Sequence, residues 1–186
     1  MQIKTLTLLA LLLIGSAGLS FKTAGAEIDA ALQAKIDAQV KQIQSWAADP
    51  VLVNAVKAQN ANLPADYAVM TEEKWAALTI LDPFVRSFNK NEAGQFLKSK
   101  KTDLILRTFV SDANGIKVGF SSKTLKWSHK GDLKHEQPMS GKIWQGALEQ
   151  DKATGLQQVQ VSVPVLDGGK PVGSLVVGLS VAKLQE

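Results

Sequence analysis

The chain has 186 residues, contains no cysteine and carries a formal net charge of +4 at pH 7. The lack of cysteine excludes disulfides, thiolate metal sites and thiol catalysis. Residues 1–26 hold Lys4 and Lys22 and no acidic residue, so the rest of the chain keeps 19 of the 21 basic residues against 17 acidic ones, a net charge of +2. That charge is too small to indicate a nucleic-acid partner.

The N-terminus has the pattern of a secretory signal peptide. Lys4 provides a short positive region, residues 5–14 are apolar, and Ala24-Gly25-Ala26 fits a small-residue cleavage site. The uncharged run falls short of the about 20 apolar residues that cross a bilayer, although its retention as an anchor is the alternative. We therefore expect residues 1–26 to be removed after Ala26. Residues 27–186 would then form a single domain in the periplasm or outside the cell.

The first part of this domain, residues 27–100, is predicted to be helical. Apolar residues recur every three or four positions along residues 28–48, which is typical of one long amphipathic helix. Asp49-Pro50 predicts a new helix start, because aspartate can cap a helix and proline is tolerated at its first position. Thr71 and Asp82-Pro83 predict two further starts.

The second part, residues 103–182, is predicted to form an antiparallel sheet. Apolar residues alternate with polar ones along residues 158–165, and apolar alternation continues after the turn Asp167-Gly168-Gly169-Lys170. A second glycine turn, Asp112-Ala113-Asn114-Gly115, joins two earlier strands. The fold class is therefore predicted to be α+β, with helices packed on the apolar face of the sheet.

This order of elements resembles that of Cache domains, the PAS-like (PDC) extracellular sensor domains, in their stand-alone exported form. The resemblance rests on the hairpins LILRTFVSDANGIKVGFSS and QVQVSVPVLDGGKPVGSLVVGLSV, on ADPVLVNAVKAQNANL, and on EEKWAAL with Trp75. It implies a long N-terminal helix and short helices packed on a PAS-like antiparallel sheet, with a ligand bound on the concave face. Any α+β domain with a long helix and alternating strands would share part of this pattern.

The resemblance also places a lid over the ligand, formed by the connection from Ser121 to Gly141. Within it, Lys126 could pair with a ligand carboxylate, and Trp127 could provide a flat apolar wall with one N–H donor. Each has an alternative role, since Lys126 could face the solvent and Trp127 could fill the hydrophobic face of the sheet. Trp144 lies on the following strand, where alternation predicts that it shares a face with Gly146 and Leu148.

Amino-acid-binding Cache domains suggest a fourth site residue. They hold the ligand's ammonium with an aspartate just before a Thr-Gly turn, and Asp151-Lys152-Ala153-Thr154-Gly155 matches that position. Their Arg-x-Trp-Tyr signature is represented here by Leu125-Lys126-Trp127-Ser128, in which a lysine replaces the arginine. A lysine does not reproduce the bidentate fork of a guanidinium. Asp151 could alternatively serve only the turn. The predicted ligand-binding residues are thus Lys126, Trp127, Trp144 and Asp151.

Nothing in the sequence indicates catalysis. The motifs G-x-S-x-G, G-x-x-x-x-G-K-[ST], G-x-G-x-x-G and H-E-x-x-H are absent. His129 and His135, with Asp132 and Glu136 near them, lie in a charged, glycine-broken segment whose spacing does not match a metal motif. We therefore predict no enzymatic activity, no cofactor and no metal.

Two functions are compatible with these observations. In the first, the chain is an exported module that binds a small organic molecule such as a carboxylate or an amino acid. It would then act through a separate membrane receptor or sensor kinase. In the second, it is a structural or protein-interaction domain whose pocket is filled by Trp127, Trp144 and leucines. An open cavity with convergent polar groups would favour the first.

Overall fold

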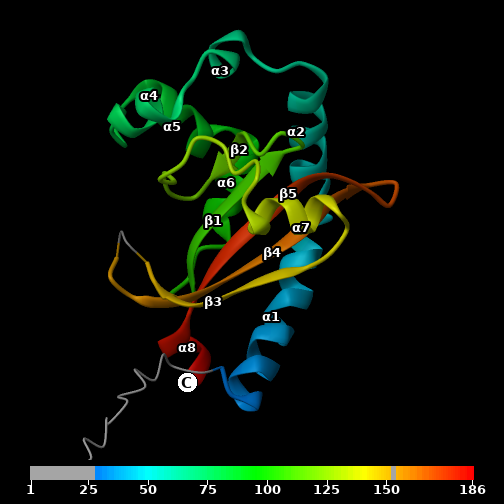
Figure 1. Cartoon of the computed structure of the whole chain (residues 1–186), viewed down its shortest axis with the longest axis vertical. Helices are drawn as coiled ribbons and strands as arrows, with labels where there is room; N and C mark the ends of the chain where they lie inside the picture. Colours follow the sequence, from blue (N-terminus) through cyan, green and yellow to red (C-terminus); the bar gives the residue numbers. More distant parts are fainter. Residues whose placement is uncertain (1–27, 152–153) are drawn as a thin grey trace, which may run out of the picture.

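The computed structural model describes residues 28–151 and 154–186 of the chain. The predicted signal peptide, residues 1–26 with cleavage after Ala26, lies outside these residues. Helices come first along the described chain and strands follow (Figure 1). The helices of the first part are α1 (Ala30–Ala47), α2 (Pro50–Ala61), α3 (Ala65–Ala68), α4 (Glu72–Ala77), α5 (Pro83–Lys90) and α6 (Glu92–Ser99).

Side-chain caps begin five of these helices. The side chains of Asp29, Asp49, Thr71, Asp82 and Asn91 each accept a hydrogen bond from a backbone N–H of the first turn, at 2.7–3.2 Å. Each cap satisfies an N–H that the helix itself leaves without a partner, which stabilises the helix by about 1 kcal/mol. In α2 and α5 the first helical residue is proline, which has no N–H to satisfy. The three predicted helix starts after residue 48 are confirmed.

The strands form one sheet in the order β2-β1-β5-β4-β3, and all neighbouring strands are antiparallel. This confirms the predicted α+β fold, in which helices pack on a PAS-like antiparallel sheet. The strands are β1 (Ile105–Asp112), β2 (Lys117–Phe120), β3 (Trp144–Gln150), β4 (Gln157–Asp167) and β5 (Lys170–Ser180).

The β4–β5 hairpin is closed by Gly168-Gly169, between the paired residues Asp167 and Lys170. Both glycines have positive φ angles, 55° and 83°. This backbone is typical of the two-residue turns whose twist matches that of the flanking strands, and glycine adopts it without strain. The glycine pair therefore sets the register of the two long central strands.

Two helices lie where the sequence pattern predicts none. The helix α7 (Leu133–Met139) lies inside the connection between β2 and β3. The helix α8 (Val181–Gln185) follows β5 directly, so the sheet ends at Ser180 and not at residue 182. Val181 is nevertheless buried, so its apolar character fits the core whether the chain is extended or helical.

The main hydrophobic core lies on one face of the sheet. The alternating valines of β4, and Leu175, Val177 and Leu179 of β5, are fully buried on this face. Helix α1 runs along it, and α2, α6 and α8 pack on the same side (Figure 1). Burial of one such aliphatic side chain contributes about 1.5–3 kcal/mol. The core residues of α1 are Leu32, Ile36, Ile43, Trp46 and Ala47.

None of the helices within residues 28–151 and 154–186 combines the length and the hydrophobicity that a membrane crossing requires.

The opposite face of the sheet is partly covered by an aromatic cluster, defined as Tyr67, Trp75, Phe84, Phe88, Phe120 and Trp127. Its contacting rings have centroid distances of 5.1–6.5 Å, mostly in edge-to-face or tilted arrangements. Trp75 is fully buried, and its indole N–H donates to the carbonyl of Thr124 at 2.9 Å. The aromatic cluster therefore joins the short helices α3–α5 to the sheet and to the connection after β2.

Beside this cluster, β2 carries a fully buried lysine, Lys117. Its Nζ lies 4.9 Å from the ring centroid of Phe109 and has no hydrogen-bond partner within the described part of the chain. Burial holds the pKa of Lys117 well below the usual lysine value, and the charge of Lys134 lowers it further, whereas Glu72 and Asp112 act in the opposite direction. The amine is thus an unfavourable group in the folded state.

Lys117→Met should raise the free energy of unfolding by about 1–3 kcal/mol near neutral pH, because methionine fills a similar volume without a buried polar nitrogen. Urea denaturation would measure the change. Lys41→Met, at an exposed position on α1, serves as the control and should change stability by less than about 0.5 kcal/mol. A clear loss of stability in Lys117→Met would show that the amine makes a favourable interaction.

Candidate functional site

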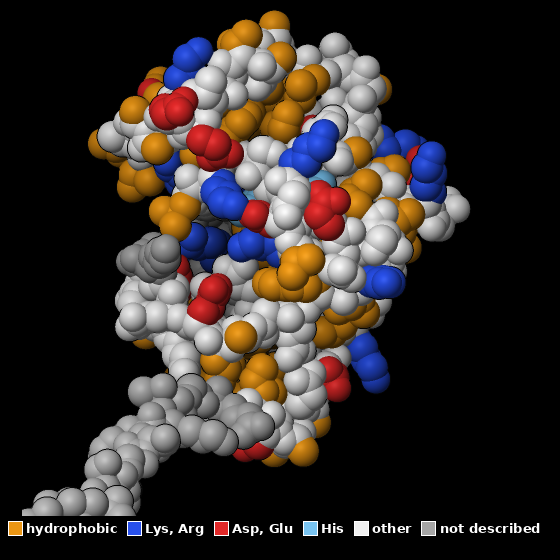
Figure 2. Space-filling view, in the orientation of Figure 1, with side chains coloured by type: hydrophobic (Ala, Val, Ile, Leu, Met, Phe, Trp, Pro, Cys, Tyr) orange, Lys and Arg blue, Asp and Glu red, His pale blue; other side chains and the backbone are white. Residues whose placement is uncertain are grey.

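The sheet face opposite the main hydrophobic core is only partly covered by the aromatic cluster. The uncovered part holds a cavity of about 540 Å³. Figure 2 shows a recess on this side of the molecule, with basic and acidic side chains gathered around it. The sheet supplies the floor through β1, β3 and β4, and the Ser121–Gly141 connection, here called the lid, supplies the cover. The residues around the cavity are Arg107, Phe109, Thr124, Leu125, Lys126, His129, Gly131, Asp132, Leu133, Lys134, Trp144, Glu149, Gln150, Asp151, Gln158 and Gln160.

Side-chain hydrogen bonds fix the lid to the body of the protein at two places. On one side, the Glu72 carboxylate accepts hydrogen bonds from the backbone N–H groups of Trp127 (2.8 Å) and Ser128 (3.0 Å). On the other side, His135 of α7 is buried and makes a 2.8 Å hydrogen bond with the Ser174 hydroxyl of β5. The cavity therefore has a defined cover rather than a loose loop above it.

Gly115 in the β1–β2 turn allows the lid to approach closely. The N–H of His129 donates to the Gly115 carbonyl at 2.9 Å. A Cβ atom on Gly115 would collide with the backbone nitrogen of Lys130, and φ at this position is +74°. Both the left-handed backbone and the missing side chain are needed here, which explains why glycine occupies this turn.

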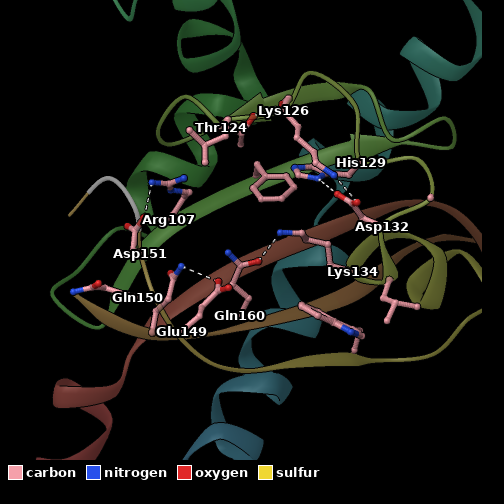
Figure 3. A pocket seen from close by; sticks show the side chains of 16 residues that line it. Arg107, Thr124, Lys126, His129, Asp132, Lys134, Glu149, Gln150, Asp151 and Gln160 are labelled. Atoms are coloured by element: carbon pink, nitrogen blue, oxygen red, sulfur yellow. Dashed lines mark hydrogen bonds and ion pairs between the residues drawn. The ribbon is translucent and has the colours of Figure 1, made fainter. Parts of the chain in front are cut away.

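An ion pair between β1 and the end of β3 forms one side of the cavity (Figure 3). The Arg107 guanidinium and the Asp151 carboxylate are 2.9 Å apart, and their side chains are 14% and 3% exposed. Asp151 Oδ2 also accepts a hydrogen bond from the Thr154 hydroxyl at 3.0 Å. The backbone N–H of Gly155 donates to the Asp151 carbonyl at 2.7 Å. Asp151 therefore serves the turn and lines the cavity at the same time.

Sequence reasoning did not identify Arg107. The signal that could have revealed it is a single arginine within the apolar strand segment LILRTFV. In the sheet, Arg107 pairs with Gly178 of β5, which pairs in turn with Gln160 of β4. Because cross-strand neighbours lie on the same face, the arginine side chain is directed to the cavity side of the sheet.

Two lysines extend from the lid towards the cavity (Figure 3). Lys134 Nζ donates to Oε1 of Gln160 at 2.9 Å, and Lys126 Nζ lies 2.7 Å from a carboxylate oxygen of Asp132. Burial is the main cause that lowers the pKa of Lys134, with smaller contributions in the same direction from the charges of Lys126 and Arg107. Asp132 and Glu149 oppose this effect. Like charges therefore act on one another across the cavity.

His129 lies at the opposite side from Arg107 and stacks on Phe109, with ring centroids 4.7 Å apart. Its Nδ1 is 2.8 Å from Oδ2 of Asp132, and its buried Nε2 has no hydrogen-bond partner in the described part of the chain. Burial lowers the pKa of His129 to about 3, and the charge of Lys117 acts in the same direction. The imidazole is therefore neutral at pH 7.

The free energy of unfolding should fall by about 2–3 kcal/mol between pH 7.5 and about pH 4.5 through His129 alone. Its folded pKa of about 3 is below the unfolded value of 6.5, so the unfolded chain binds more protons in this range and acid favours unfolding. Urea denaturation at both pH values would measure the loss. In His129→Gln the loss should be smaller by that amount. An unchanged pH dependence in this variant would contradict the neutral, buried state of His129.

The structure brings three of the four predicted ligand-binding residues to the cavity. Lys126, Trp144 and Asp151 line it, and a Cβ atom on Gly146 would lie 2.9 Å from the Trp144 ring, so this glycine leaves room for the indole. Trp127 is 4% exposed and is not among the residues around the cavity. Its ring packs instead in the aromatic cluster, where it fills part of the sheet's apolar face.

A β-bulge in β3 contradicts the predicted orientation of Leu148. Trp144 pairs with Ser162, and the register then shifts between Gln145 and Leu148. Leu148 consequently pairs with Val159 and packs on the hydrophobic core, whereas Trp144 lines the cavity. The extra residue in one strand reverses the alternation of its side chains. The prediction that Trp144 and Leu148 share a face is therefore wrong.

Within residues 28–151 and 154–186, no three histidine, aspartate or glutamate side chains are grouped as a metal site would require. His129 contacts Asp132, whereas His135 is turned towards Ser174 and the carbonyl of Ala113.

No family model matches the sequence, and no curated protein matches it either. Among solved structures, the chain is similar to the ligand-binding domain of the Pseudomonas aeruginosa amino acid chemoreceptor PctC in complex with GABA (11% identity, TM-score 0.49). It is also similar to the ligand-binding domain of the Campylobacter jejuni chemoreceptor Tlp3 in complex with L-norvaline (20% identity, TM-score 0.46). A third similar structure is the Escherichia coli DcuS sensor domain (13% identity, TM-score 0.47).

The three matches cover similar shares of this chain but different shares of the other proteins. They cover 82%, 83% and 84% of this chain, respectively. The chain spans 56% of each of the two chemoreceptor domains and 96% of the DcuS domain. All three TM-scores are below 0.5 and no identity exceeds 20%, so the ligands of these proteins do not define the ligand of this chain.

Proposed function

We propose that the chain is an exported Cache-like sensor module that binds a small organic molecule in the cavity between the sheet and the lid. The single observation that carries this proposal is the cavity itself. Its volume of about 540 Å³ lies within the range of about 300–1,000 Å³ that is typical of small-molecule sites. Such sites combine apolar walls with a few well-placed polar groups. Here Phe109 and Trp144 supply walls, and Arg107 and Lys134 supply charged donors.

The alternative function, an interaction domain with a filled pocket, has less support. A filled pocket would require the predicted tryptophans to occupy the space over the sheet. Trp127 is packed in the aromatic cluster, and Trp144 is half-buried at the cavity wall. The two tryptophans therefore leave the cavity over the sheet open.

A thermal-shift screen tests the proposal. The panel contains short carboxylates, amino acids, amines and neutral analogues, because a ligand that binds the native state raises the melting temperature by mass action. The ligand found should raise the melting temperature of the wild type and have much less effect on Trp144→Ala, which loses one wall. Leu156→Ala is the control, since Leu156 is exposed and lies outside the cavity. No shift with any compound in a broad panel would favour the interaction domain.

The proposed compartment is the periplasm or the extracellular space, with a membrane receptor or sensor kinase as the partner. The support is the signal-peptide pattern of residues 1–26. Mass spectrometry of the protein from its native host should find an N-terminus at Glu27 or within a few residues of it. Recovery of Met1 in the membrane fraction would show that the leader acts as an anchor.

A further inference from the structure

We propose that the cavity selects carboxylates that lack an amino group, and that Arg107 and Lys134 bind the carboxylate while the Arg107–Asp151 pair discriminates against amines. This inference rests on the proposed function and specifies its ligand class. It differs from the expectation drawn from amino-acid-binding domains, in which the aspartate at the position of Asp151 would hold the ligand's ammonium group.

Asp151 already has a cationic partner within the protein. Its carboxylate is 3% exposed and lies 2.9 Å from the Arg107 guanidinium, and the Thr154 hydroxyl donates to its second oxygen at 3.0 Å. A ligand ammonium would have to compete with an existing, largely buried cation for the same carboxylate. Such charge-assisted bonds are stronger than neutral ones, and the planar guanidinium is the cation best matched to a carboxylate. Asp151 is therefore already neutralised by the protein.

Arg107 and Lys134 have more N–H donors than their partners in the protein use. A guanidinium has five N–H donors and an ammonium has three. Asp151 engages Nη2 of Arg107, and Gln160 engages one donor of Lys134 at 2.9 Å. Further N–H groups of both side chains are available at the cavity wall. The spare hydrogen-bonding capacity of the cationic residues thus fits a ligand that accepts hydrogen bonds and carries negative charge.

Three cationic side chains, Arg107, Lys126 and Lys134, line the cavity. Burial is the main cause that lowers the pKa of Lys134; the charges of Asp132 and Glu149 raise it, and those of Lys126 and Arg107 lower it by less. A carboxylate placed beside Arg107 and Lys134 would relieve the repulsion between these two cations, whereas an ammonium would increase it. Asp132 is 2.7 Å from Lys126 and 2.8 Å from His129 Nδ1, so this acidic group is also engaged by the protein.

The apolar residues that line the cavity determine which hydrocarbon group of a ligand fits there. Phe109, Trp144 and the lid leucines Leu125 and Leu133 present apolar surface to the cavity. Aromatic walls of this kind contact flat or branched hydrocarbon groups well. The favoured ligand is therefore an amphipathic monocarboxylate with an aromatic or branched aliphatic body.

Isothermal titration calorimetry with matched ligands tests this inference. The series 3-phenylpropanoate, L-phenylalanine and 2-phenylethylamine shares one hydrocarbon body and differs in the charged groups. The series 4-methylpentanoate, L-leucine and 3-methylbutylamine repeats the comparison with an aliphatic body. In at least one series the plain carboxylate should bind at least tenfold more tightly than the amino acid, and the amine should not bind measurably.

The outcomes separate this inference from the proposed function. An amino acid or amine that binds as tightly as its carboxylate would overturn the proposed selectivity and leave the cavity as a ligand site. Binding of only those ligands that lack a carboxylate would likewise overturn the proposed selectivity and leave the cavity as a ligand site. If no compound of either series or of the broad thermal-shift panel binds, both the selectivity and the proposed function are contradicted.

Two variants identify the residues involved. Lys134→Met should weaken binding of the plain carboxylate at least tenfold, whereas Lys130→Met, exposed on the lid and outside the cavity, should change it less than twofold. Arg107→Met should weaken the carboxylate and also reduce the discrimination against the amino acid, because Asp151 then loses its guanidinium partner. Circular dichroism verifies that each variant is folded at the temperature of titration. Unchanged affinity and selectivity in folded Lys134→Met and Arg107→Met would refute the assigned roles.

Discussion

Trp75→Ala should lower the free energy of unfolding by about 3–5 kcal/mol, the range found when a buried aromatic side chain is truncated. Trp75 is fully buried and contacts Phe84, Phe88, Phe120 and Trp127 within the aromatic cluster. Its loss would leave a void that these rigid rings are poorly able to fill. Urea denaturation followed by far-ultraviolet circular dichroism would measure the change.

Two further variants separate the contributions of Trp75. Trp75→Phe retains an aromatic ring but removes the N–H that donates to the Thr124 carbonyl at 2.9 Å, and it should cost less than the alanine variant. Leu81→Ala is the surface control, because Leu81 is 73% exposed, and should cost less than about 0.5 kcal/mol. A loss below about 1 kcal/mol in Trp75→Ala would contradict the role of the aromatic cluster in holding α4 and the lid on the sheet.

Arg107→Met should destabilise the protein by about 3–5 kcal/mol, because a buried carboxylate loses its cationic partner. The chain offers a matched control in the exposed pair of Lys57 and Asp167. The two ion pairs have nearly equal lengths, 2.9 Å and 2.8 Å, but the side chains of the second are 46% and 44% exposed. Lys57→Met should therefore cost less than about 1 kcal/mol.

Denaturant unfolding of both variants under the same conditions gives the comparison. The ratio of the two losses in the free energy of unfolding measures how strongly solvent weakens the exposed pair, since solvent screening is the main difference between the two ion pairs. Equal losses would show that Asp151 is as well solvated as a surface carboxylate. That result would also remove the physical basis for the proposed selectivity against amines.

Much of the fold could be predicted because local physical chemistry determines it. The capping side chains and prolines mark helix starts, and Gly168-Gly169 marks the hairpin between β4 and β5. The valines of β4 alternate in the sequence because only one of its faces packs on α1. The β-bulge in β3 was not predictable in this way, since it depends on pairing with β4 and leaves no mark in the alternation of a short, half-buried strand.

The site was less predictable than the fold, because it is assembled from distant segments. A polar residue at a turn, such as Asp151, is visible in sequence, but its partner Arg107 lies 44 positions away on β1. Trp127 illustrates the opposite difficulty. A tryptophan in a lid can face the cavity or the neighbouring aromatic rings, and the choice depends on Trp75 and Phe88, which come from different helices.

Nuclear magnetic resonance of the indole N–H groups tests most directly the claim that the cavity binds a ligand. The chain has four tryptophans, and Trp→Phe variants would assign their signals. During titration with 3-phenylpropanoate, the Trp144 signal should shift saturably with the dissociation constant found by calorimetry. The signal of Trp46, in the core on the other face, should not move, and that of Trp127 should move far less than that of Trp144. Two results would contradict the claim that the ligand binds in the cavity. One is binding measured by calorimetry without a shift of the Trp144 signal. The other is a titration in which the Trp127 signal shifts the most.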